Sequence, residues 1–239
     1  MRQQLLNVHF PPAYAYGDWV RHAGAEAAMN RLALWLIHGG RIWLDSEQAA
    51  GKTHLLNALQ EDHPQLGLVC VDDMRSGHAM HLVSGWLEEL KDKALWVLDM
   101  KAGPAPAACG LALFHLIERA REAHRPLLIS WRCPNDALAP AELSSRLAGF
   151  ERIQMQPPQN DAELRSVLLS VATSRQWSAD EAVVDLLLSR CTRQLDELLN
   201  IIQNLEIASL AEGRRLSTAW ARKRLGRESE LPGFSPDVN

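Results

Sequence analysis

The pattern of hydrophobic and polar positions changes character after residue 157. Up to that point, short apolar runs alternate with stretches that repeat apolar residues at helical spacing, which is typical of βαβ units on a parallel sheet. The predicted strands are 41–44, 67–71, 94–99, 126–131 and 151–156, and the predicted helices are 25–38, 52–61, 78–92, 107–124 and 141–149. The sequence therefore predicts an α/β core with a five-stranded parallel sheet that is covered on both faces.

Beyond the segment QPPQN at 156–160, only helical periodicity remains. A capping box from Ser178 to Glu181 predicts a helix start, and Gly213 predicts a helix end. Apolar stripes at helical spacing lie on either side of the capping box, at Leu164, Val167, Leu168 and Val171 and at Leu195, Leu198, Leu199 and Ile202. We expect four segments, which are a flexible tail over 1–16, an α/β nucleotide-binding core over 17–157, a small all-α domain over 158–226 and a tail over 227–239.

Composition and charge exclude several classes of function. With 239 residues, 47% of them hydrophobic, the chain can bury a substantial core, and its formal charge of −4 argues against a surface built to neutralise nucleic-acid phosphates. We expect any contact with DNA to be indirect or weak, although residues 214–224 include a basic strip. The longest apolar run, 32–37, is too short to cross a bilayer and no signal peptide is evident, so we expect a cytoplasmic protein without a membrane partner.

The cysteines and histidines do not predict a metal site, and the tryptophans are expected in the core. Four cysteines without CxxC spacing are expected to be reduced, small apolar residues, and they are Cys70, Cys109, Cys133 and Cys191. His78 and His81 lack nearby carboxylates or cysteines, so we expect them to be solvated or packed rather than metal-bound. The tryptophans, such as Trp35, Trp86 and Trp96, lie in apolar stripes and are expected in the core.

The segment SEQAAGKT at 46–53 follows a predicted strand and opens a predicted helix, which is the setting of a phosphate-binding loop. Gly51 lets backbone amides face an anion, Lys52 adds positive charge, and Thr53 offers a hydroxyl to magnesium. Ser46 and Ala49 stand where such loops usually carry glycine, and Ala49 would cost about 1 kcal/mol if its position requires positive φ. With Ala50, these residues predict a weakened phosphate loop, and a helix cap by coincidence is the alternative.

Two further candidates end predicted strands. Asp99 closes the run ALWVLDM, where its carboxylate can hold magnesium beside the loop, unless it only caps a helix. The next residue is Met100 rather than a glutamate that would activate water, so we expect slow intrinsic hydrolysis or none. Ser130 ends the run PLLIS and places a hydroxyl within reach of a terminal phosphate or water.

Residues 19–225 resemble the AAA+ module of the DnaA family of bacterial replication initiators, and more closely its shortened Hda branch. The resemblance depends on the phosphate loop, on ELSSRLAGF at 142–150, which is similar to the family's box VII, and on TRQLDELLN at 192–200, which is similar to its sensor 2 helix. It implies an AAA+ P-loop core followed by a small all-α lid. It also implies that Arg146 is an arginine finger acting in trans and that Arg193 is the sensor 2 arginine. For each of the two, a solvated surface arginine is the alternative.

The same resemblance implies ligands and partners. The nucleotide would be ADP or ATP, with Thr53 and Asp99 as ligands of any magnesium and Ser130 at sensor 1, although Trp131 and Arg132 depart from the family pattern. Trp19 and Val20 align with the segment that flanks adenine, though core packing is the alternative. The expected partners are DnaA and the DNA polymerase III sliding clamp, and a homodimer is a further option. The N-terminal segment QQLLNV resembles the clamp-binding motif of the family through Gln3, Leu6 and Val8, with Gln4 as a departure.

Three functions remain open. The first is a clamp-associated regulator that stimulates hydrolysis of DnaA-bound ATP and so prevents re-initiation. The second is a non-catalytic adaptor with a degenerate nucleotide site that recruits DnaA or a helicase. The third is an independent P-loop ATPase or kinase, which would need a base beside Asp99. We expect no double-strand-reading domain after the basic segment STAWARKRLG, because about a dozen residues follow it.

Overall fold

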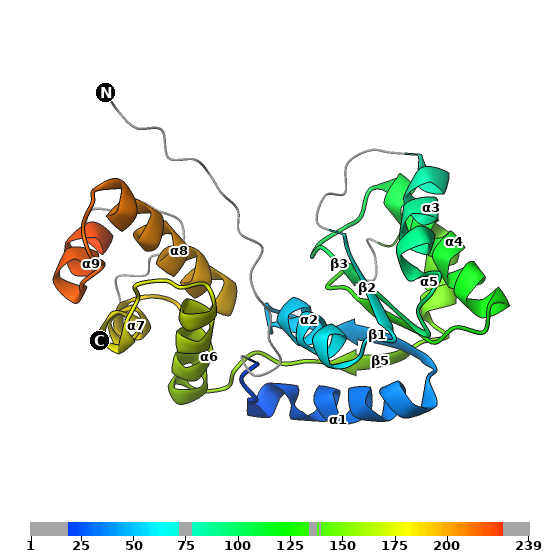
Figure 1. Cartoon of the computed structure of the whole chain (residues 1–239), viewed down its shortest axis with the longest axis horizontal. Coiled ribbons are helices and arrows are strands. Elements are labelled where there is room, and N and C mark those ends of the chain that lie inside the picture. Colours follow the sequence, from blue (N-terminus) through cyan, green and yellow to red (C-terminus); the bar gives the residue numbers. More distant parts are fainter. Residues whose placement is uncertain (1–18, 72–77, 134–137, 139, 227–239) are drawn as a thin grey trace. The chain divides into compact units, whose positions relative to one another are not determined.

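The computed structural model describes residues 19–71, 78–133, 138 and 140–226 and divides the chain into two compact units. One unit is Ala23–Pro157, and the other comprises Pro158 onward together with the residues up to His22. Figure 1 labels most of the elements of the two units.

The Ala23–Pro157 unit is an α/β layer structure. Its strands are β1 (Arg41–Asp45), β2 (Leu66–Val71), β3 (Leu95–Met100), β4 (Leu127–Ser130) and β5 (Glu151–Gln154), and its helices are α1 (Ala23–His38), α2 (Lys52–Asp62), α3 (Ala79–Leu90), α4 (Ala107–Glu122) and α5 (Ala141–Leu147). All strand pairs are parallel, in the order β2-β3-β4-β1-β5. The predicted five-stranded parallel sheet is therefore confirmed.

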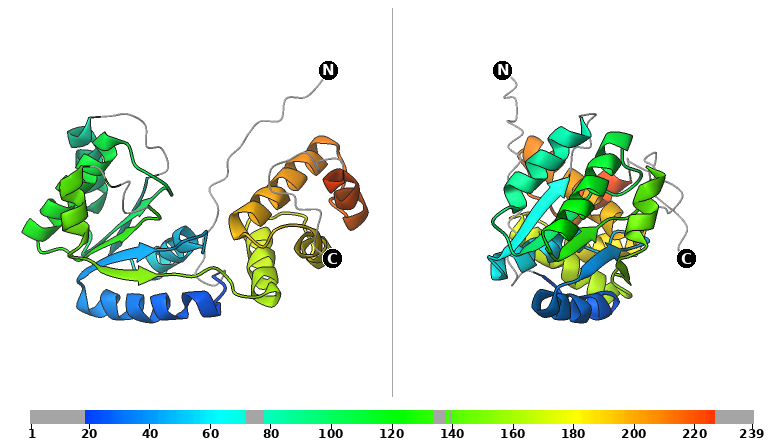
Figure 2. Two further views of the ribbon diagram at one scale, coloured as in Figure 1. Left: turned by 180° about the vertical axis from the view of Figure 1, so that it is seen from behind. Right: turned by 90° about the vertical axis from the view of Figure 1, so that its right-hand side faces the viewer.

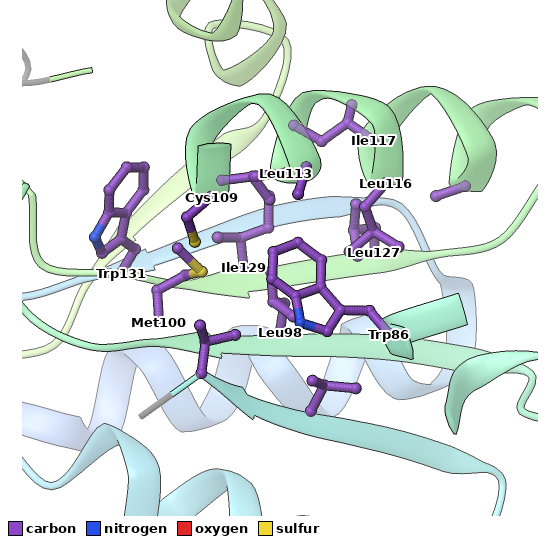
Figure 3. Packing of buried hydrophobic residues seen from close by; sticks show 14 of the residues in the cluster. Trp86, Leu98, Met100, Cys109, Leu113, Leu116, Ile117, Leu127, Ile129 and Trp131 are labelled. Carbon is purple, nitrogen blue, oxygen red and sulfur yellow. The ribbon is translucent and has the colours of Figure 1, made fainter. Parts of the chain in front are cut away.

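The two faces of the sheet are covered by different helices. Helices α3, α4 and α5 lie on one face, and α1 and α2 lie on the other (Figures 1 and 2). Side chains of successive strand residues alternate between the faces, so Trp43 packs in the cluster under α3, α4 and α5, while its buried neighbours Ile42 and Leu44 lie outside that cluster. The cluster includes the expected core residues Trp86 and Trp96 together with Trp131. Figure 3 shows Trp86 and Trp131 in this cluster.

The second unit is helical, as predicted. It contains α6 (Asp161–Ser174), α7 (Glu181–Arg190), α8 (Leu195–Ala211) and α9 (Thr218–Leu225). The predicted stripes form its core through six buried side chains, which are Leu164, Leu168, Val171, Leu195, Leu198 and Ile202. Helix α8 ends shortly before Gly213, whose φ of +60° is the left-handed conformation expected after a helix end.

The start of α7 differs from the prediction of a capping box at Ser178. The helix begins at Glu181, and the side chain of Asp180 accepts a hydrogen bond from the backbone amide of Val183. The backbone amides of Ser178 and Ala179 instead donate to the buried carboxylate of Glu206 on α8. Asp180, two residues after Ser178, is therefore the N-cap of α7.

The four cysteines are free thiols, as expected of reduced residues, but they differ in burial. Cys109, Cys133 and Cys191 are buried, but Cys70 is exposed on the edge strand β2. Burial raises the pKa of the Cys109 thiol to about 11, so this cysteine behaves as a small apolar side chain.

Candidate functional site

The candidate site lies where three neighbouring strands end. Strand β4 pairs with both β1 and β3, and the register places Ser130 beside Leu44 on one side and beside Asp99 on the other. The carboxyl ends of parallel strands meet at one edge of the sheet, which is where ligands of open α/β sheets bind. Asp99 and Ser130 are both buried there, as is Asp45 at the end of β1.

The loop between β1 and α2, residues 46–51, has the backbone of a helix-opening anion loop. Gly51 has φ 80° and ψ 22°, and its carbonyl accepts the first bond of α2, from the amide of Leu55. Within this loop, positive φ occurs only at Gly51, so Ala49 does not adopt the conformation that would strain it. The expected cost at Ala49 therefore does not arise.

Lys52 is held at the loop by Ser46. Its Nζ donates to Ser46 Oγ at 2.5 Å, and the Ser46 side chain is buried. Burial lowers the pKa of Lys52 to about 8, the charges of Asp99 and Asp45 oppose this shift, and the charge of Arg132 adds to it. Lys52 is thus a half-buried cation that remains protonated at neutral pH.

Thr53 and Asp99, the predicted magnesium ligands, are brought together. The Thr53 hydroxyl donates to Asp99 Oδ2 at 2.5 Å. A hydroxyl and a carboxylate oxygen are hard ligands that suit Mg²⁺, which completes its shell with water and phosphate oxygens. Within the described residues there is no cluster of three or more His, Cys, Asp or Glu side chains, so these two oxygens fit a phosphate-bound magnesium rather than a site built from protein ligands alone.

Ser130 is fully buried, and its Oγ has no hydrogen-bond partner among the residues that the structure describes. A buried hydroxyl without a partner is costly, so it is expected to have one in the working protein. Its strand position beside Asp99 makes a bound phosphate or water the natural acceptor or donor.

Sequence reasoning missed Asp45, which contacts the loop, and Arg152, which contacts Asp45. The Asp45 carboxylate accepts from the Ser46 amide at 2.7 Å through Oδ1. Its Oδ2 accepts from Arg152 Nε at 3.0 Å. An acidic residue at the end of an otherwise apolar strand was the available signal for Asp45, whereas Arg152 lies 107 positions away and carries no local signal.

Arg146 lies on α5 and is not part of the core. Its side chain is 43% exposed, Nε lies 2.7 Å from Glu118 Oε1 on α4, and the guanidinium carbon lies 5.5 Å from the centroid of the Phe114 ring. These contacts turn Arg146 toward α4, and no contact with the phosphate loop is among them. The position suits an arginine that is presented at the surface.

Arg193 belongs to the helical unit. It precedes α8, and its Nε and Nη2 donate to the Asp161 carboxylate at 2.8 and 3.1 Å. Hydrogen bonding to Asp161 raises the pKa of Arg193, and the same bond lowers the pKa of Asp161. Both side chains are about half exposed, so the pair stabilises the unit little.

The remaining predicted residues lie near or in the N-terminal segment. Trp19 and Val20 are half-buried, and the Trp19 ring centroid lies 5.9 Å from that of His22. The predicted clamp-binding residues Gln3, Leu6 and Val8 lie outside the described residues. Among the helices described between residues 19 and 226, none has the length and apolar character needed to cross a membrane.

Comparison with known proteins found similarity to the Hda lid domain and to structures of the initiator DnaA. Residues 161–225 match the family model described as Hda, lid domain. Domain III of the replication initiation protein DnaA from Thermotoga maritima superposes with a TM-score of 0.65 at 18% identity, covering 90% of this chain and 97% of that one. AMPPCP-bound DnaA from Aquifex aeolicus gives 0.57 at 16% identity, with 92% and 73% covered.

The RuvB Holliday junction branch migration motor of Thermotoga maritima is also similar, with a TM-score of 0.59 at 12% identity, 90% of this chain and 72% of that one being covered. At such low identities the structural likeness shows the fold alone. The match to the lid model covers helices α6 to α9. The chain therefore has the fold of DnaA domain III, and its residues 161–225 match the Hda lid domain.

Proposed function

We propose that this protein is a regulator of bacterial replication initiation that associates with the sliding clamp and stimulates hydrolysis of ATP bound to DnaA. One observation carries the proposal: the candidate phosphate-binding side chains and an exposed arginine lie on different elements. Lys52, Thr53 and Asp99 form the candidate phosphate site, and Met100 follows Asp99 where a base would be needed. The exposed arginine is Arg146 on α5. The Hda-type lid supports the same assignment.

In this proposal the protein's own site binds ADP. The amides that follow Gly51 and the Lys52 ammonium would hold the phosphates, and Ser130 would hydrogen-bond a phosphate oxygen or a water. Thr53 and Asp99 would hold magnesium, which when bound neutralises charge on the phosphate oxygens. Arg193 would leave Asp161 to contact the nucleotide as the sensor 2 arginine.

The same site is poorly equipped to hydrolyse ATP by itself. Met100, the residue after Asp99, is buried in the core cluster beneath α4, as Figure 3 shows. A thioether neither accepts a proton nor orients a water molecule effectively. We therefore infer that the bound nucleotide serves binding and shape rather than turnover, which disfavours the independent ATPase.

Arg146 would act on the nucleotide of DnaA. An arginine that enters another subunit's phosphate site stabilises the charge of the transition state, and such fingers contribute about 10³- to 10⁵-fold in GTPases. To reach a partner, the side chain must leave Glu118. The Arg146 side chain is 43% exposed and the Glu118 side chain 19% exposed, so solvent screens the pair from the arginine side, and we expect release to cost on the order of 1 kcal/mol.

The test is conversion of DnaA-bound ATP to ADP in the presence of clamp loaded on DNA. Arg146→Ala is expected to abolish stimulation while leaving the complex with DnaA largely intact. Arg121→Ala is the matched control, because Arg121 on α4 pairs with the same Glu118 carboxylate, at 2.7 Å, and is similarly exposed. If Arg146→Ala stimulates as well as the unchanged protein, or if Arg121→Ala loses stimulation equally, the finger assignment is wrong.

That assay also separates the alternative adaptor. An adaptor without catalytic input would leave hydrolysis unstimulated by the unchanged protein, although DnaA is still recruited. Its nucleotide site would then serve recruitment only. Association measured apart from hydrolysis therefore distinguishes the two functions.

Clamp association is proposed to depend on Gln3, Leu6 and Val8. An extended segment can place the two apolar side chains in a hydrophobic groove while the glutamine makes a polar contact. A chain that begins at Phe10 should lose clamp binding, and a chain lacking residues 227–239 should retain it. Unchanged clamp binding by the first chain would exclude this role.

A further inference from the structure

The residue immediately before the phosphate loop, Asp45, joins the loop to the edge of the sheet. It is 4% exposed and ends β1. One carboxylate oxygen accepts from the Ser46 amide at 2.7 Å. The other accepts from both Nε and Nη2 of Arg152, at 3.0 and 2.5 Å.

The guanidinium of Arg152 also stacks on the ring of Trp43. It lies on β5, where the parallel register pairs it with Trp43 of β1, and its guanidinium carbon lies 4.6 Å from the centroid of a Trp43 ring. The Trp43 Nε1 donates to the Trp131 carbonyl at 3.0 Å, which holds the indole in place. A guanidinium that stacks on a ring and forks onto a carboxylate has little freedom left.

The connection continues to the phosphate-binding lysine. Ser46 donates its amide to Asp45 and accepts from Lys52 Nζ through its hydroxyl. The hydroxyl exists because serine stands where such loops usually carry glycine. A continuous series of contacts therefore runs from Arg152 through Asp45 and Ser46 to Lys52.

We propose that Arg152 is a positioning residue of the phosphate site. Through Asp45 it fixes Ser46, and it thereby sets the loop conformation that presents the backbone amides and Lys52 to a phosphate. The inference rests on the proposed binding of nucleotide and adds how a loop with serine at its first position is organised. A loop already held in its binding conformation loses less entropy when the ligand binds.

Arg152→Gln tests the proposal, with Arg31→Gln as its matched control. Arg31 also donates through Nε and Nη2 to a carboxylate, that of the adjacent β5 residue Glu151, at 2.6 and 2.5 Å, and these contacts do not involve the loop. Two quantities are measured for each protein, the hydrogen exchange rate of the Ser46 amide without nucleotide and the dissociation constant for ADP. A charge-assisted pair of this kind is strong enough that Arg152→Gln should change both about tenfold, whereas Arg31→Gln should change neither by more than about twofold.

A double-mutant cycle tests the route through Asp45. Asp45→Asn should weaken ADP binding, and adding Arg152→Gln to it should weaken binding little further, because the second change removes a contact already lost. Arg152→Lys, which keeps the charge but not the fork, should fall between the unchanged protein and Arg152→Gln and serves if the glutamine variant does not fold.

Several outcomes would overturn the assignment. They are an unchanged Ser46 exchange rate in Arg152→Gln, equal losses in Arg31→Gln, or independent effects of Asp45→Asn and Arg152→Gln. If the unchanged protein does not bind ADP at all, the proposed nucleotide function fails, while the exchange rate of Ser46 still decides whether Arg152 orders the loop. The two failures are therefore distinguishable.

Discussion

Replacing Ser130 with alanine should make the nucleotide-free protein more stable and the nucleotide complex weaker. The hydroxyl is fully buried without a hydrogen-bond partner among the described residues, and an unsatisfied buried hydroxyl costs about 1–3 kcal/mol. Alanine removes that cost and leaves a void no larger than one oxygen atom. We therefore expect Ser130→Ala to raise the free energy of unfolding by about 1 kcal/mol. If the hydroxyl bonds a charged phosphate, the same change removes about 1.5 kcal/mol of binding, which is about a tenfold rise in the dissociation constant for ADP.

The assay is urea-induced unfolding of the nucleotide-free protein together with an ADP titration. Ser209→Ala is the matched control, because Ser209 is also buried but its Oγ donates to the Glu206 carbonyl at 2.9 Å. That change should lower the free energy of unfolding by about 0.5–1.5 kcal/mol and leave ADP affinity unchanged. A loss of stability in Ser130→Ala would mean that the hydroxyl is already satisfied without ligand. Unchanged ADP affinity would remove Ser130 from the phosphate site.

Three further outcomes follow from the site. Glu118→Gln should speed stimulated hydrolysis of DnaA-bound ATP about fivefold, since releasing the partly exposed Arg146 from its ion pair saves on the order of 1 kcal/mol. A slower rate would refute the pair as a restraint. Affinity for ADP, titrated without magnesium, should fall as the pH rises through about 8. The reason is that the protonated form of Lys52 would hold the phosphate, and burial lowers the pKa of Lys52 to about 8. An affinity that stays constant up to about pH 10 would count against Lys52 as the phosphate ligand. Gly51→Ala should weaken ADP binding and cost about 1 kcal/mol of stability because φ is 80° there, whereas Ala49→Gly should change binding little, and equal effects of the two would contradict the loop geometry.

The elements of the α/β unit were predictable to within one or two residues over most of their length. Short apolar runs and helical stripes are local signals, and the parallel pairing follows from the alternation of strand and helix, whereas the strand order was not predicted. The start of α7 was not predictable by the same route. Both Ser178 and Asp180 are suitable caps, and the choice depends on Glu206 of α8, whose buried carboxylate takes the amides of Ser178 and Ala179.

The site shows the same limit. Lys52, Thr53 and Asp99 were found from sequence because motif and strand position are local, and the structure brings them together. Arg152 was not found, because its partner Asp45 lies on another strand and only the parallel pairing of β1 with β5 joins them. Contacts between strands that are far apart in the chain produce no periodic pattern in the sequence.

Two residues depart from the usual pattern of a phosphate loop and its sensor strand, Ser46 and Trp131, and both have well-defined contacts with their neighbours. Trp131 follows Ser130, yet it does not crowd the site, because it is fully buried and its Nε1 donates to the Gly103 carbonyl at 3.0 Å. Its own carbonyl receives Trp43, on which Arg152 stacks. The two indoles therefore link the ends of β1 and β4, and through Arg152 and Asp45 we expect them to help a loop with Ser46 in place of glycine to keep its conformation.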